Sequence, residues 1–193
     1  VMNRHPAVLA RMAATAAELS GGRIELGIGA GGHPAEHAAY GIDFPERPRR
    51  GEHLVEAIEV LRRLFSGGPV DYEGRFYRLD DAHAFPAPDP PPRIIVAGET
   101  AIGARVAARH GDAWTCFGGK YEALLPSFEA ELEAVGRSRA DIPVLIGLEV
   151  ADLGDDLEAV TASWHERGAA ELIVHDVKPA QLDGVLALAH ARR

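Results

Sequence analysis

Ser20–Gly32 reads SGGRIELGIGAGG, and this stretch decides how the rest of the chain is interpreted. Gly21 is placed to end the helical pattern before it, because glycine readily takes the left-handed conformation that closes a helix. The alternation over residues 23–28 then predicts a strand with bulky residues on one face and small or charged residues on the other. Gly29 opens a loop with almost no side chains. Such a loop after a strand suits the approach of a phosphate-bearing ligand.

The composition is that of a globular protein and argues against several classes of partner. The 193 residues, 47% hydrophobic and 25% charged, fit one domain over residues 1–193. A net charge of -9 argues against nucleic acid, and no apolar run reaches the roughly 18 residues that a membrane span needs. The single cysteine, Cys116, forms no internal disulfide and fits a reducing compartment, so we expect a cytoplasmic protein.

Helices and strands alternate along the chain. Strands are predicted over residues 23–28, 94–97, 112–115, 144–150 and 171–175. Helical patterns between the strands favour parallel pairing with right-handed crossovers, and hence the α/β class. Five strands suffice for a doubly wound sheet, whereas a (β/α)₈ barrel needs eight strands and usually about 250 residues.

Three other segments have clear local patterns. Apolar residues at helical spacing predict a first helix over residues 6–20, which has no strand before it. Residues 70–79 are expected to form a hairpin closed by Glu73-Gly74. The last helix, over 179–191, is expected to turn Leu182, Val185, Leu186 and Ala189 inward.

The glycine loop admits three interpretations. Gly27–Gly32 matches the G-x-G-x-x-G pattern of dinucleotide-binding folds, but Pro34 and Gly41 leave no room for the long helix that such a site requires. A tight turn with a purely structural role is the second interpretation. The third, which we favour, is that a cofactor phosphate or ring approaches the bare backbone.

Two further motifs are candidates for a metal or phosphate site. His33–His37 matches the H-x-x-E-H zinc motif, but the segment is short, and a polar loop at the mouth of the site is favoured over a metal site. Gly98-Glu99-Thr100 follows a buried strand and opens a helix, so it suits a phosphate cradle, a helix N-cap, or both. In that cradle the carboxylate of Glu99 must point away from a bound phosphate.

The remaining reactive side chains receive no catalytic role. Trp114 is more typical of a core than of a cofactor wall, and Cys116 is interpreted as a packed thiol. The other seven histidines, His175 among them, are scattered, and none has a triad-like context. No catalytic residue is assigned from the sequence.

Taken together, these residues resemble the luciferase-like monooxygenase family, in its flavin- and deazaflavin-dependent branch. The resemblance covers roughly residues 3–118. Its matching stretches are Arg4–Ala10, Ala14-Thr15, Leu19–Arg23, Leu26–Gly31, Glu36-His37, Tyr40-Gly41, Glu56-Ala57, Tyr72–Tyr77, Pro91–Gly98 and Asp112–Trp114.

The resemblance implies a partial TIM barrel made of strands four to eight, with a small hairpin insertion. The first three strands of such a barrel would then be absent, and with them much of the substrate-side chemistry. The cofactor would lie at the carboxyl ends of the strands. Its phosphate tail would be bound by residues similar to Gly29, Ala30, Gly31, Gly32, Gly98, Glu99 and Thr100.

The resemblance also implies an oxidoreductase or monooxygenase that uses FMN or coenzyme F420 on a small organic substrate. F420 is slightly favoured, and NAD(P)H is a candidate reductant. The alternative is a non-catalytic remnant that binds a phosphate-bearing ligand weakly or serves as a dimeric scaffold, so activity of this chain by itself stays open. Because open sheet edges need cover, we expect a homodimer or a second chain that supplies the missing strands.

Overall fold

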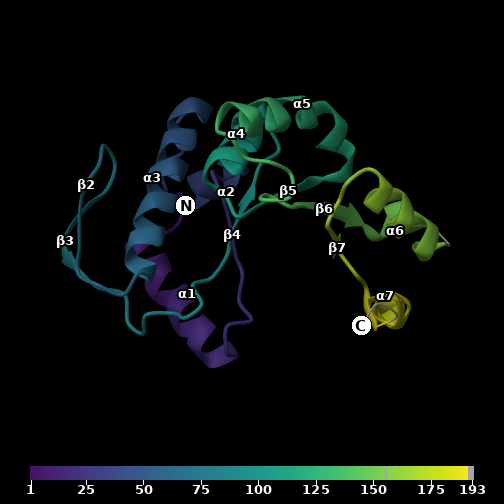
Figure 1. Ribbon diagram of the computed structural model, residues 1–193, viewed down its shortest axis with the longest axis horizontal. Helices are drawn as coiled ribbons and strands as arrows, with labels where there is room; N and C mark the ends of the chain where they lie inside the picture. Colours follow the sequence, from purple (N-terminus) through teal and green to yellow (C-terminus); the bar gives the residue numbers. More distant parts are fainter. Residues whose placement is uncertain (155, 191–193) are drawn as a thin grey trace.

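The computed structural model describes residues 1–154 and 156–190, and its centre is a parallel sheet of five strands (Figure 1). The strand order is β1-β4-β5-β6-β7, so each strand pairs with the next strand of this sheet, and β1 and β7 form the open edges. The strands are β1 (Leu26–Gly29), β4 (Ile94–Ala97), β5 (Ala113–Phe117), β6 (Val144–Glu149) and β7 (Glu171–His175). This arrangement confirms the predicted partial α/β barrel.

Helices connect the strands, and most of them lie on the convex side of the sheet, which bends into an open arc (Figure 1). They are α1 (Pro6–Ser20), α2 (Pro34–Ala39), α3 (Arg47–Phe65), α4 (Ala101–His110), α5 (Gly118–Ala134), α6 (Leu157–Glu166) and α7 (Leu182–His190), with 3₁₀ turns at Val150–Leu153 and Pro179–Gln181. Within the described residues, no helix is both long and apolar enough to cross a membrane.

The two faces of the sheet belong to two separate apolar clusters. Odd-numbered strand residues Ile95, Ala113 and Leu145 pack together on the concave face, with Ile173 beside them. Their even-numbered neighbours, Trp114 among them, face the helices in the main core. Odd-numbered residues of these strands therefore line the inside of the arc, and even-numbered residues face the helices.

Helix α1 turns its smaller residues inward. Ala10, Ala13, Ala14 and Ala17 are buried against the rest of the fold. The large apolar residues Val8, Met12 and Leu19 are 53%, 51% and 83% exposed. The helix was predicted correctly, but its bulky stripe has no covering element within the described residues.

The hairpin differs from the predicted two-residue turn. Its strands are β2 (Val70–Glu73) and β3 (Arg78–Ala82), so the loop spans residues 74–77. Glu56, on α3, accepts hydrogen bonds from the backbone N–H groups of Arg75, Phe76 and Tyr77 at 2.8, 3.0 and 3.3 Å. A side chain distant in sequence therefore holds the wider loop.

The last helix also differs from prediction. It begins at Leu182 after a 3₁₀ turn, and Leu182 and Leu186 are 46% and 42% exposed rather than buried. Val185 is half-buried and packs on the core, as expected. The side chain of Ala189 and residue 191 lie outside the described part of the chain. An inward apolar face requires a neighbouring element, and the described residues supply one only at Val185.

Candidate functional site

The glycine loop after β1 is exposed and its shape depends on Gly31. This residue has φ of +84°, a conformation that side chains with a Cβ rarely adopt. A Cβ there would lie 3.2 Å from Cε2 of Phe44. Gly32, by contrast, would have no heavy atom within 4 Å of its Cβ. The loop therefore exposes bare backbone at Gly32, whereas at Gly31 it lies close to the ring of Phe44.

A stack of side chains fixes the loop from below. His37 is 4% exposed, and its Nδ1 lies 2.9 Å from the carbonyl oxygen of His33. Its ring lies 4.5 Å from that of Phe44, and the Arg50 guanidinium lies 3.9 Å from the centre of the Phe44 ring. His37 thus supports the loop.

The side chains of the H-x-x-E-H motif do not converge on a common site. His33 and Glu36 are exposed on the surface while His37 is buried. Among the described residues, no three His, Cys, Asp or Glu side chains are grouped so that they could hold a metal ion.

Gly98 brings strand β4 and helix α4 very close together. A Cβ on Gly98 would lie 2.6 Å from the carbonyl carbon of Gly103, so both positions need glycine. The Gly98 N–H donates to the oxygen of Thr115 at 3.0 Å, and the Gly98 oxygen accepts from Nε1 of the fully buried Trp114 at 3.2 Å. Gly98 therefore shapes the loop and has no spare N–H for a ligand. Trp114 is a core residue, as the sequence suggested.

Thr100 and Glu99 already have partners on this loop. Thr100 is the N-cap of α4, and its Oγ1 accepts from the N–H of Gly103 at 3.2 Å. The N-cap interpretation of the motif is thus confirmed. Oε1 of Glu99 accepts from the N–H of Phe117 at 2.8 Å. The first turn of α4 still carries N–H groups without an internal acceptor, which is the usual property of a helix N-terminus.

The two loops lie side by side at one edge of the sheet. Strands β1 and β4 pair so that Gly29 is opposite Ala97, which puts residues 30–32 next to residues 98–100. The predicted site residues are therefore brought together at the carboxyl ends of the strands. Whether they bind a phosphate stays a prediction.

Cys116 is not a reactive group in this site. It is 2% exposed, and burial, helped by the charge of Glu99, raises the pKa of its thiol to about 12. The thiolate is the nucleophilic form, so the thiol is inert at neutral pH.

Three residues of the concave face were missed by the sequence analysis. Phe117 and His175 lie with their ring centroids 5.1 Å apart, at the carboxyl ends of β5 and β7. Both rings lie close to Gly147 on β6, where an added Cβ would be 3.0 Å from Nε2 of His175. The sequence does carry a signal for His175. It lies two residues after Ile173 in the same strand, and side chains two positions apart face the same side of a sheet, here the concave one.

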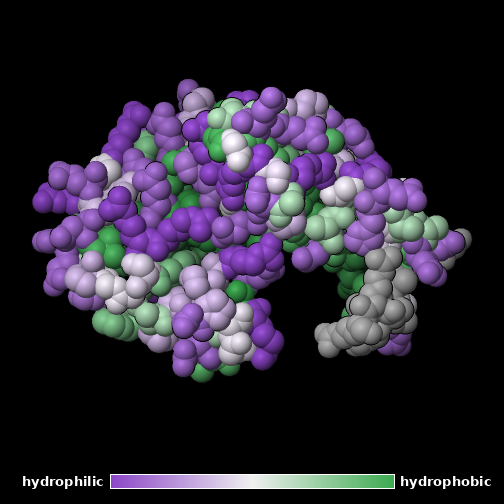
Figure 2. Space-filling model, in the orientation of Figure 1, coloured by the Kyte–Doolittle hydropathy of each residue, from purple (hydrophilic) through white to green (hydrophobic). Residues whose placement is uncertain are grey.

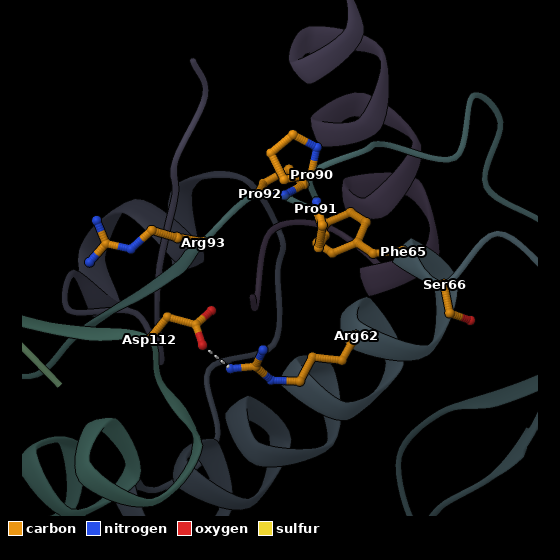
Figure 3. Close-up of a pocket in the computed structure, with 8 residues that line it drawn as sticks. All are labelled: Arg62, Phe65, Ser66, Pro90, Pro91, Pro92, Arg93 and Asp112. Carbon is orange, nitrogen blue, oxygen red and sulfur yellow. Dashed lines mark hydrogen bonds and ion pairs between the residues drawn. The ribbon is translucent and has the colours of Figure 1, made fainter. Parts of the chain in front are cut away.

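A cavity of about 490 Å³ lies at the opposite, amino-terminal end of the strands (Figure 3). It is lined by Arg62, Phe65, Ser66, Pro90, Pro91, Pro92, Arg93 and Asp112. Asp112 pairs with Arg62 at 2.8 Å and also accepts from the N–H of Ile94 at 2.8 Å. Arg93 pairs with Glu25. The interactions of Asp112 connect α3 to the amino-terminal ends of β4 and β5.

The model of one protein family, described as luciferase-like monooxygenase, matches residues 1–190. The chain belongs to this family. It is 35% identical over 167 residues to an F420-dependent glucose-6-phosphate dehydrogenase from Kineococcus radiotolerans, covering 83% of the chain and 49% of the relative. It is 33% identical over 175 residues to the pyrimidine monooxygenase RutA of Escherichia coli, covering 86% and 47%.

A solved structure supports the same assignment. An F420-dependent secondary alcohol dehydrogenase, in complex with an F420-acetone adduct, matches with a TM-score of 0.70 and 26% identity, over 77% of this chain and 46% of that one. The chain thus spans about half the length of the relatives it matches. Some relatives are F420-dependent enzymes and others are monooxygenases, so the family includes both kinds of chemistry.

Proposed function

We propose that this chain forms the cofactor-tail half of an oxidoreductase that uses F420 or FMN on a small organic substrate. The observation that best supports this proposal is the register of β1 and β4, which places the bare loop of residues 30–32 beside the N-terminus of α4. Backbone N–H groups and a helix N-terminus favour an anionic group such as a phosphate. Family membership favours this function over a non-catalytic remnant.

The residues present fit the tail of such a cofactor. Gly32 leaves open space beside the loop, and Gly31 has a positive φ that glycine adopts readily. The loop would therefore receive the tail without a large rearrangement. When bound, the cofactor supplies the redox chemistry, as hydride transfer or oxygen activation, while the chain orients it and excludes water.

F420 is our preferred cofactor. The first four relatives are all F420-dependent glucose-6-phosphate dehydrogenases. FMN with NAD(P)H as reductant is the second candidate, in keeping with the monooxygenase relatives. The cytoplasmic location stays a prediction.

Binding tests the proposal without requiring turnover. Purified protein is titrated with F420 and, separately, with FMN, and fluorescence is followed. Gly32→Asp is expected to weaken binding, since a carboxylate about 6 Å from the phosphate costs about 0.7 kcal/mol in water, or about threefold, for a singly charged phosphodiester such as that of F420. For the doubly charged phosphate of FMN the cost is about 1.4 kcal/mol, or about tenfold. Gly68→Asp is the matched control: Gly68 is equally open and lies beyond the far end of α3. No binding of either cofactor at tens of micromolar would refute the proposal.

We also propose that a second copy of this chain covers part of the open arc. The concave side is visibly hollow and has hydrophobic residues in its wall (Figure 2). Both edge strands lack a neighbour in the described fold, and the stripe of Val8, Met12 and Leu19 is exposed. Proteins commonly protect such surfaces by pairing the open strand edges and by burying the exposed apolar residues in an interface.

The mass in solution tests the dimer. A mass near twice 20.6 kDa by light scattering is expected at micromolar concentration. Met12→Gln should lower the dimer fraction, and Glu18→Gln, exposed on the same helix, should not. A monomer would contradict the dimer and would favour a different polypeptide that supplies further β/α units.

A further inference from the structure

The cavity at the amino-terminal ends of β4 and β5 has the size of a small-molecule site (Figure 3). Its volume of about 490 Å³ falls within the range of about 300–1,000 Å³ that is usual for such sites. All of its lining residues lie between Arg62 and Asp112, so one chain builds it. Residues 30–32 and 98–100 lie at the other end of the strands, so a ligand in this cavity leaves the proposed cofactor site free.

Consecutive prolines give the cavity a wall that is already in place. Pro90, Pro91 and Pro92 lie on one side of the space, together with Phe65, the last residue of α3 (Figure 3). Pro90 and Pro91 are exposed. A proline has a fixed φ and no N–H group, so this wall is rigid and donates no hydrogen bond. A ligand therefore meets a preformed apolar surface and loses little free energy to ordering it.

Arg62 lies opposite the prolines and brings hydrogen-bond donors to the cavity. Its side chain extends to Asp112 (Figure 3). Nη2 donates to Oδ1 of Asp112 at 2.8 Å and to the carbonyl oxygen of His110 at 2.9 Å. Within the described residues, Nη1 and Nε of Arg62 have no hydrogen-bond acceptor. Because the side chain is 45% exposed, the N–H groups of these two atoms are available to a ligand.

The charges around the cavity are already balanced. Arg62 forms an ion pair with Asp112, and Arg93 forms one with Glu25. The second oxygen of Asp112 accepts from the N–H of Ile94 at 2.8 Å, so the protein itself satisfies this carboxylate. An anion that entered would lose its hydration without meeting an uncompensated positive charge. The cavity therefore suits an uncharged ligand that accepts a hydrogen bond.

We propose that this cavity binds an uncharged, mostly apolar small molecule whose carbonyl oxygen accepts a hydrogen bond from Arg62. The prolines and Phe65 contact the apolar body of the ligand, and the free N–H groups of Arg62 hold its oxygen. This inference does not depend on the proposed function, since none of the lining residues belongs to the two loops proposed for the cofactor tail.

Acedan, an uncharged dimethylaminonaphthalene that carries an acetyl group, is the probe, and its emission moves to shorter wavelength in an apolar site. It is titrated into the protein beside two analogues, one that lacks the acetyl group and one that carries a carboxylate instead. We expect acedan to bind about fivefold more tightly than the analogue without the carbonyl, which is the usual contribution of one hydrogen bond. The carboxylate analogue should bind more weakly than acedan.

Arg62→Met removes the donors and keeps most of the length of the side chain. It should weaken acedan about fivefold and leave the analogue without the carbonyl unchanged, so the preference between the two probes disappears. A general loss of structure would weaken both probes alike, so this ratio reports on the hydrogen bond. Pro91→Ala should weaken both probes by a similar factor, about twofold, because it removes part of the apolar wall. Thermal unfolding and circular dichroism verify that each variant is folded.

Arg75→Met is the matched control. Arg75 is also an exposed arginine that pairs with one carboxylate, that of Glu52 at 2.6 Å, and it lies in the hairpin loop outside the cavity. Its loss should leave both affinities unchanged. Failure of acedan to bind at hundreds of micromolar would overturn the inference, as would a preference for acedan that survives in Arg62→Met. Tighter binding of the carboxylate analogue would overturn it too, and so would equal acedan affinity in the wild type, Arg62→Met and Pro91→Ala, which would place the probe elsewhere on the protein.

Discussion

Gly31→Ala is expected to destabilise the protein by about 2 kcal/mol, whereas Gly32→Ala is expected to be neutral or stabilising. Gly31 has φ of +84°, and a left-handed conformation costs a residue with a Cβ about 1–2 kcal/mol. The new Cβ would also lie 3.2 Å from Phe44, whose ring is held against Arg50 and has little freedom to retreat. This crowding adds a fraction of a kcal/mol.

Gly32 is the internal comparison, because it is the next residue of the same loop. It lies outside the left-handed region and has open space where the Cβ would be. An alanine there restricts the unfolded chain and stabilises the fold by about 0.4–1 kcal/mol where the backbone permits it. Both variants add the same methyl group, so a difference in their stability reflects the backbone conformation that each position requires.

Urea and thermal unfolding measure the difference. For a chain of this size, about 2 kcal/mol corresponds to a fall of about 4–8 °C in Tm. Cofactor titration on the folded variants gives a second readout, since a displaced loop should also bind more weakly. Equal Tm values for Gly31→Ala and Gly32→Ala would refute the reasoning, because the loop would then not depend on the conformation of Gly31.

Three other changes test the surroundings of the site. Gly98→Ala should lower the free energy of unfolding by about 1–3 kcal/mol, because its Cβ would lie 2.6 Å from the backbone of Gly103; unchanged urea unfolding would contradict this. Glu56→Ala removes the acceptor for the N–H groups of residues 75–77, so proteolysis in that loop should be faster than in Glu56→Gln; equal rates would exclude the role. Burial raises the pKa of Cys116 from 9.0 to about 12, so the folded state keeps a proton that the unfolded state loses. Stability should therefore fall from about pH 9 to 12 more steeply in the wild type than in Cys116→Ala, and parallel slopes would disprove this contribution.

Local patterns were enough to predict the strands and the adjacency of the two loops. The periodicity located all five parallel strands, and the carboxyl ends of parallel strands necessarily share one edge. The first strand starts at Leu26 rather than residue 23, because pairing with β4 begins there. Such ends depend on the partner strand, which the local sequence does not specify.

Features that depend on distant contacts were not predictable in this way. The hairpin loop is wider than expected because Glu56, from α3, binds its backbone. The orientation of α1 followed from close packing of its alanines, whereas large apolar residues would suggest the opposite face. The ring contact between Phe117 and His175 joins residues 58 positions apart in sequence. Only the sheet order reveals that they meet.

Glu99 places a negative charge beside the loops that we propose for the cofactor tail. Its carboxylate is anchored to Phe117 at the edge where the two loops meet, so it is a fixed negative charge beside the N-terminus of α4. The repulsion that an arriving anion meets grows in proportion to that anion's own charge. A singly charged phosphodiester, as in F420, is therefore penalised about half as much as the doubly charged phosphomonoester of FMN. If the proposed site binds the cofactor tail, Glu99→Gln is expected to narrow the gap in affinity between F420 and FMN.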